Sequence, residues 1–239
     1  MTVYYVLKNK LGELVVDNLN NPTYAKLSHS RTSFIAGLYD KNIANQILES
    51  LPQKTAIIFS DNNWYTHVED FFSKKPDIKF AFQERTTFSS DSLSIKHLNS
   101  LKKSLLEGFV LDKVDANAIE NLPKELTENY SAYFGSAEKF MKQGLGFYVR
   151  YGKDIVCLAS AALPIIDNSL EIDIITIDDP QYRRKGLATA ACIALIEFCL
   201  KESITPHWDA QDERSAIFAK KLGFTKPVKW KLYYWYKKP

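Results

Sequence analysis

The sequence predicts a mixed α/β fold, of the α+β class, in two parts. Segments with the helical spacing of apolar residues alternate with short β-branched runs along the 239 residues. This alternation is loose at first and becomes regular from residue 108. We therefore expect a smaller N-terminal α/β domain over 1–105, of unknown role, and a second domain over 106–239.

Composition excludes several classes of protein. Hydrophobic residues make up 46% of the chain and charged residues 25%, as in ordinary soluble globular proteins. The 31 basic and 28 acidic residues nearly balance, which makes nucleic-acid binding unlikely as the main role. The start lacks a basic segment followed by a long apolar run, and no stretch reaches the length of a membrane span. The three cysteines have no CxxC spacing and apolar neighbours, so we expect buried thiols and a cytoplasmic protein without a metal site.

The N-terminal part gives few clear elements. NIANQILESL (42–51) has helical spacing, and 54–61 and 77–85 are β-rich. The segment 23–40 fits neither pattern well, and it is left unassigned. The polar segment TTFSSDSLS (86–94) is the predicted linker.

The C-terminal part is more regular. Strands are predicted at 109–115, 146–152, 154–165, 170–177, 205–210 and 228–236. Helices are predicted as two pieces within 117–143, separated by Pro123 and Gly135, and at 187–203 and 213–222. The helix over 187–203 is apolar almost all round, which indicates burial. Asp212 is the expected N-cap of the last helix, and Gly223 follows its end.

QYRRKGLATAA (181–191) joins a β-branched strand to this buried helix. The backbone N–H groups of 184–188 are the unpaired donors of a helix N-terminus, which favour an anion such as a pyrophosphate. Gly186 allows close approach of a ligand, and Ala188 keeps the first turn narrow. The alternative is an exposed turn with solvated cations. The loop lacks the Walker and Rossmann glycine patterns.

Residues from about 108 to 239 resemble the GCN5-related N-acetyltransferase (GNAT) superfamily. RRKGLA (183–188) matches its Arg/Gln-x-x-Gly-x-Gly/Ala signature, and DERSAIFAKKLGF (212–224) resembles its Asn-x-x-Ser/Ala…Lys-x-Gly-Phe helix. More narrowly, GSAEKFMKQGLGFYV, YRRKGLATA, PHWDA and AKKLGF are similar to zwittermicin-resistance-type acetyltransferases. The resemblance implies a mixed, mostly antiparallel central sheet flanked by helices.

The resemblance also implies that acetyl-CoA is the co-substrate. The loop amides would bind its pyrophosphate, and the end of the strand over 170–178, which splays from the 205–210 strand, would offer backbone groups to its pantetheine arm. Asp212 replaces the usual asparagine and, when ionised, accepts but does not donate. The implied cofactor-binding residues are Ile177, Asp178, Arg183, Arg184, Lys185, Gly186, Leu187, Ala188, Asp212 and Ser215.

Acetyl transfer needs a neutral amine, so a general base is expected. Glu171 and Asp173 face the same side of the central strand, where the family often has its base. Glu171 is our first candidate and Asp173 our second. The alternative is that this face is solvent-exposed and both carboxylates simply solvate it.

The general acid is harder to place. The family's usual tyrosine position corresponds to Ala219, so Tyr233, Tyr234 or Tyr236 would substitute, or the thiolate departs unaided. His207 and Asp209 could line the acceptor pocket, although a lone histidine is more often structural.

The leading hypothesis is therefore an acetyl-CoA-dependent N-acetyltransferase whose acceptor is a small-molecule or peptide amine. The departures at Asp212 and Ala219 leave a non-catalytic CoA-binding sensor or scaffold as the alternative. A homodimer is possible through the N-terminal domain.

Overall fold

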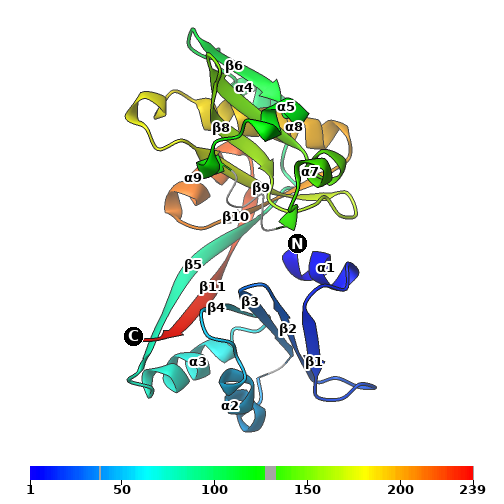
Figure 1. Cartoon of the computed structure of the whole chain (residues 1–239), viewed down its shortest axis with the longest axis vertical. Helices are drawn as coiled ribbons and strands as arrows, with labels where there is room; N and C mark the ends of the chain where they lie inside the picture. Colours follow the sequence, from blue (N-terminus) through cyan, green and yellow to red (C-terminus); the bar gives the residue numbers. More distant parts are fainter. Residues whose placement is uncertain (38, 127–132, 239) are drawn as a thin grey trace. The chain divides into compact units, whose positions relative to one another are not determined.

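The computed structural model describes residues 1–37, 39–126 and 133–238 (Figure 1). They form a mixed α/β fold whose strands join in one mixed sheet, as predicted. The chain divides into two compact units. One, the C-terminal unit, contains Met1 and Thr87–Val228; the other, the N-terminal unit, contains Thr2–Thr86 and Lys229–Pro239.

The N-terminal unit is built on strands in the order β1-β2-β3-β4-β11-β5. Strand β3 pairs with β4 in parallel, and helix α2 makes the crossover between them. The other registered pairs, β1–β2, β2–β3 and β4–β11, are antiparallel. Its elements are α1 (Thr2–Lys8), β1 (Glu13–Val16), β2 (Tyr24–His29), β3 (Thr32–Gly37), α2 (Lys41–Glu49), β4 (Thr55–Phe59) and α3 (Trp64–Ser73).

Aromatic side chains fill the core of the N-terminal unit. Trp64 is fully buried and stacks on Phe59 with ring centroids 5.1 Å apart. Tyr233, also fully buried, stacks on Phe80 at 5.3 Å. Tyr233 comes from β11, close to the end of the chain. The last strand is therefore part of the N-terminal core, because burying such rings is strongly favourable.

The C-terminal unit carries the strands in the order β10-β9-β8-β7-β6. Registered pairs are antiparallel from β6 to β9, and β9–β10 is parallel. Its elements are α4 (Ile95–Leu101), β6 (Phe109–Lys113), α5 (Ala116–Glu120), a 3-10 turn (Lys124–Leu126), α7 (Ala137–Gln143), β7 (Gly146–Tyr151), β8 (Asp154–Ala161), β9 (Ser169–Thr176), a 3-10 turn η2 (Pro180–Tyr182), α8 (Leu187–Lys201), β10 (Thr205–Ala210) and α9 (Glu213–Leu222). Two strands, β5 (Ile78–Ser89) and β11 (Thr225–Lys237), run through both units.

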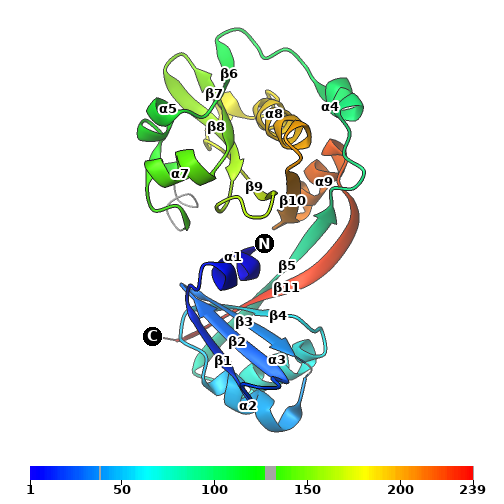
Figure 2. The ribbon, with the colours of Figure 1, turned by 90° about the vertical axis from the view of Figure 1, so that its right-hand side faces the viewer.

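Helix α8 is the centre of the C-terminal core. It packs on β7 and β8, opposite the face of the sheet that carries α5 and α7 (Figure 2). Ala191, Cys192, Leu195 and Ile196 are fully buried along it. This matches the prediction from its all-round apolar sequence. Cys157 and Cys199 are also buried free thiols, as expected.

Two sequence-based expectations need correction or restatement. The segment 86–94 is structured, because its first residues continue β5, Phe88 is buried and Ser94 caps α4. The boundary between the two units nevertheless falls at its start, between Thr86 and Thr87. The compact units of the structure also differ from the two domains predicted with a boundary between residues 105 and 106. Helix α4 lies before that point but packs on α8 and α9, with Leu98 fully buried. Of the predicted helical region 117–143, residues 127–132 lie outside the described residues.

Candidate active site

A loop with a constrained backbone joins β9 to α8. The Asp179 carboxylate caps η2 by accepting the Gln181 N–H at 2.8 Å, and Asp178 forms an ion pair with Arg183. Arg184 and Gly186 both take left-handed φ angles, 58° and 78°. A non-glycine residue in this region is uncommon and marks a constrained position. The loop therefore turns sharply just before α8 begins.

The N-terminus of α8 has no side-chain cap. Helices α2, α4, α5, α7 and α9 each have an Asp or Ser at the N-cap whose side chain accepts a backbone N–H. At the same position α8 has Gly186, which offers no acceptor. A Cβ built on Gly186 would meet nothing within 4 Å, so the backbone here is open. Open, uncapped amides with the positive end of the helix dipole favour an anion.

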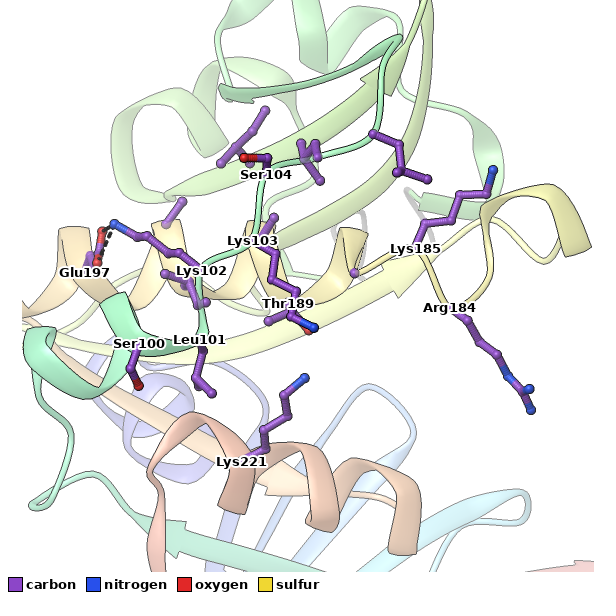
Figure 3. Close-up of a pocket in the computed structure, with 17 residues that line it drawn as sticks. Ser100, Leu101, Lys102, Lys103, Ser104, Arg184, Lys185, Thr189, Glu197 and Lys221 are labelled. Carbon is purple, nitrogen blue, oxygen red and sulfur yellow. Dashed lines mark hydrogen bonds and ion pairs between the residues drawn. The ribbon is translucent and has the colours of Figure 1, made fainter.

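A cavity of about 940 Å³ lies beside this end of α8 (Figure 3). The predicted loop residues Arg184, Lys185 and Gly186 line it, together with Thr189 on the first turn of the helix. Its other walls are the segment that follows α4 and the last turn of α9. Five cationic side chains line the cavity: Lys102, Lys103, Arg184, Lys185 and Lys221. Sequence analysis did not place the three lysines outside the loop in a site. Lys221 is the lysine of the Lys-x-Gly-Phe match, and the basic pair at 102–103 was the only signal of the other two.

The strands β9 and β10 part beside the loop. They pair in parallel at Thr205↔Ser169, Pro206↔Leu170 and His207↔Glu171, where their register ends. Strand β9 runs on to Thr176 and stays paired with β8 to that point. The registered pairing of β9 with β10 thus ends before β9 does, which is compatible with the splay that the resemblance implies. Its last pair joins the candidate base, Glu171, to His207.

Glu171 and Asp173 are both partly exposed on one face of β9. His207 is partly buried, and this burial lowers the pKa of its imidazole, so the ring is neutral near neutral pH. The residues that line the cavity do not include Glu171 or Asp173. The two candidate carboxylates therefore lie at the strand splay, and the cationic residues line the cavity.

Other candidate residues are already engaged. The N–H of Ile177 donates to Val156 at 2.9 Å, and its carbonyl accepts from Asp179 at 2.8 Å. Leu187 is buried at 2% exposure, whereas Ala188 is partly exposed. The Ser215 hydroxyl accepts from the Trp208 indole at 3.1 Å. These residues shape the loop and the start of α9.

Asp212 is the N-cap of α9, as predicted. Its carboxylate accepts the Ser215 N–H at 2.8 Å and pairs with Arg214 at 2.9 Å. The hydrogen bond from Ser215, followed by that from Arg214, holds the pKa of Asp212 below its ordinary value of 3.8. The side chain is thus an ionised acceptor committed to its own helix.

Replacing Asp212 by alanine should lower the free energy of unfolding by about 1 kcal/mol, because the cap is lost. Asp212→Asn should retain most of it, since asparagine caps equally well. The pKa of Asp212 is lower in the folded than in the unfolded protein. Its ionised carboxylate therefore stabilises the fold at a pH above the unfolded-state pKa, and this stabilisation is lost as the pH falls through the folded-state pKa. Urea unfolding at pH 7 and pH 3 should therefore show the alanine defect shrinking at pH 3. An equal loss for both variants at pH 7 would contradict the capping role.

The candidate positions for a general acid lie in different surroundings. Ala219 is fully buried, so its position faces the core. The Tyr233 hydroxyl donates to Glu69 at 2.8 Å inside the N-terminal unit, and burial, followed by this bond, raises the pKa of Tyr233 far above its ordinary range. Tyr234 and Tyr236 belong to the same N-terminal unit. The Tyr233 hydroxyl is therefore committed to Glu69, and a role of Tyr234 or Tyr236 as the acid stays a prediction.

The three cysteines are buried free thiols. Burial raises the pKa of Cys157 to about 11 and that of Cys199 to about 12, and it raises the pKa of Cys192 as well. Neutral buried thiols are poor nucleophiles.

Within the described ranges, no cluster of His, Cys, Asp or Glu side chains could hold a metal ion. None of the helices in those ranges combines the length and hydropathy needed to cross a membrane.

Comparisons with known proteins show the family and the fold of the chain. A family model described as GNAT acetyltransferase matches residues 1–233. The chain is 29% identical over 205 residues to the uncharacterized N-acetyltransferase YdfB of Bacillus subtilis, covering 84% of this chain and 71% of that protein. A GCN5-related N-acetyltransferase-like protein from Streptococcus suis is 25% identical with a TM-score of 0.75, covering 98% and 93% of the two chains. A GCN5-related N-acetyltransferase from Kribbella flavida, at 14% identity, shares the fold with a TM-score of 0.60 over 97% of this chain and 93% of its own.

The family model covers more of the chain than the motifs do. The sequence motifs begin near residue 108, whereas the matched region starts at residue 1. It therefore includes the N-terminal unit up to β11, which sequence patterns alone left without a known fold.

Proposed function

The chain belongs to the GNAT acetyltransferase family, and from this membership we propose that it transfers the acetyl group of acetyl-CoA to a primary amine of a small molecule or peptide. Membership makes the protein a transferase enzyme. The donor, the acceptor and the residues that act are the proposal. One observation carries it: the uncapped, open N-terminus of α8 lies at the end of the strand that parts from β10.

The loop supplies the donor site in this proposal. Backbone N–H groups from Arg184 to Ala188 donate to the pyrophosphate, and Gly186 gives them room. Arg184 and Lys185 add positive charge from the cavity wall, while Arg183 is held by Asp178. The backbone of β9 beyond Glu171, from Ile172 to Thr176, is the place for the pantetheine arm, because its registered pairing with β10 has ended.

Glu171 acts as the general base. The amine nitrogen attacks the thioester carbonyl carbon, an N–C bond forms, and the C–S bond breaks with the electron pair leaving on sulfur. Glu171 takes the first proton, which the ammonium group loses before attack, directly or through water, with Asp173 as second candidate. The second proton leaves the nitrogen as the amide forms and passes to water. The thiolate, with a pKa near about 8.5, departs without a tyrosine acid.

The acceptor is a cationic amine before reaction. Glu171 and Asp173 on β9 and Asp209 on β10 place carboxylates near the splay, which favours a positively charged substrate. Aminoglycoside-like compounds, polyamines and peptide amines all carry such a group. We extend the proposal to the zwittermicin-resistance-type subfamily on the motifs quoted above; cytoplasmic location and homodimer formation remain predictions.

A thiol-release assay tests the proposal. The full chain is incubated with acetyl-CoA and a panel of aminoglycosides, polyamines and peptides, and free CoA is measured with a thiol reagent while mass spectrometry detects the acetylated amine. We expect amine-dependent CoA release for at least one cationic class. Tight CoA binding with no transfer across the panel would favour the non-catalytic sensor instead.

A further inference from the structure

The cavity beside α8 has a second group of cations beyond the loop. Lys103 lies in the segment after α4, and Lys221 lies in the last turn of α9. Figure 3 shows both side chains reaching towards the space beside Thr189. These lysines are far apart in the sequence and are brought together because α4 packs on both α8 and α9.

The positive charge of this cavity is largely uncompensated. Glu197 is its lining carboxylate, and it is 9% exposed and paired with Lys102 at 2.7 Å. For Lys103, Lys221 and Arg184 the described part of the chain provides no carboxylate within ion-pair distance. Like charges around one cavity repel each other, so a bound anion is favoured there.

The position of the two lysines indicates which anion. Thr189 is three residues beyond Gly186, about 4.5 Å further along the helix axis. A ligand whose pyrophosphate rests on the loop amides would therefore place its next group beside Lys103 and Lys221. In CoA the pyrophosphate joins the pantetheine arm to the adenosine. Because the proposed function assigns the pantetheine arm to β9, the remaining group is the adenosine, whose ribose carries a 3′-phosphate.

We propose that Lys103 and Lys221 bind the 3′-phosphate of CoA and make the enzyme select CoA over 3′-dephospho-CoA. The inference rests on the proposed function, because it assumes that the donor is a CoA thioester. A phosphomonoester carries nearly two negative charges at neutral pH, and two ammonium groups form charge-assisted hydrogen bonds to it. Each lysine should then contribute roughly tenfold to CoA affinity.

Calorimetric titration of the full chain with CoA and with 3′-dephospho-CoA tests this. The wild type should bind CoA roughly 100-fold more tightly than dephospho-CoA, because two charge-assisted contacts each contribute roughly tenfold. Lys221→Ala should lower this ratio about tenfold, because it weakens the binding of CoA and leaves the affinity for dephospho-CoA unchanged. Lys103→Ala should behave alike. Lys220→Ala is the matched control, since Lys220 is an exposed neighbour in the same turn that does not line the cavity.

The outcomes are distinguishable. Equal binding of CoA and dephospho-CoA to the wild type overturns this inference and leaves the proposed function standing. An equal effect of Lys220→Ala and Lys221→Ala also overturns it, because a general charge effect would then explain the loss. Failure of both ligands to bind overturns the proposed function and the inference with it.

Discussion

Gly186→Val is expected to weaken acetyl-CoA binding by about 100-fold, and Arg184→Ala by only a few-fold. Gly186 has a φ of 78°, which a β-branched residue adopts only with strain of about 1–3 kcal/mol. The valine side chain would also occupy the open space in front of the amides, where the pyrophosphate is proposed to lie. Arg184→Ala removes a screened surface charge and leaves the amides in place.

Gly152→Val is the matched control. Gly152 also has a left-handed φ, 59°, and open space around its missing Cβ, but it lies in the turn between β7 and β8. Gly152→Val should lower the free energy of unfolding by a similar amount and leave the affinity for CoA unchanged. Calorimetric titration measures the affinities, and thermal unfolding measures the stabilities. If Arg184→Ala is more harmful than Gly186→Val, or Gly152→Val equally harmful, the amide-binding account is wrong.

Glu171→Gln should lower kcat by about 100-fold or more, with acetyl-CoA affinity unchanged, because glutamine keeps the shape of glutamate but cannot take a proton. Asp173→Asn is the matched control, and its defect should stay below about tenfold. The defect of Glu171→Gln should narrow as pH rises towards the pKa of the amine, about 10.4 for a lysine-like group. The neutral amine is then already abundant, and the base is needed less.

Rates of CoA release at saturating acetyl-CoA, measured over pH 6 to 10, check this prediction. A purely structural role of Glu171 would give a defect that does not vary with pH. A larger defect for Asp173→Asn would reverse the assignment of the base. Either result would contradict the role given to Glu171.

Much of the C-terminal unit could be predicted from the sequence, since its signals are local. Helix α8 is apolar all round, and α9 has its cap and its terminal glycine where the sequence indicates them. The hairpin of β2 and β3 was not predicted. Its turn places Ser30 at a φ of 53°, so no glycine or asparagine marks it. The place of β11 in the N-terminal core depends on contacts distant in sequence, such as that of Tyr233 with Phe80.

The candidate site shows the same limit. The loop over 183–188 could be found because its residues are contiguous, and the carboxylates because their spacing of two puts them on one face of a strand. Lys103 and Lys221 could not, because only the packing of α4 on α8 and α9 brings them to one cavity. The pairing of Glu171 with His207 required the strand register.

The central claim is that the loop between β9 and α8 binds a CoA thioester. Titration of the full chain with acetyl-CoA in a calorimeter tests it most directly. We predict one binding site per chain with a dissociation constant in the range of about 1 μM to 1 mM, typical of enzyme substrates. No detectable binding of acetyl-CoA or CoA at millimolar concentration would contradict the claim.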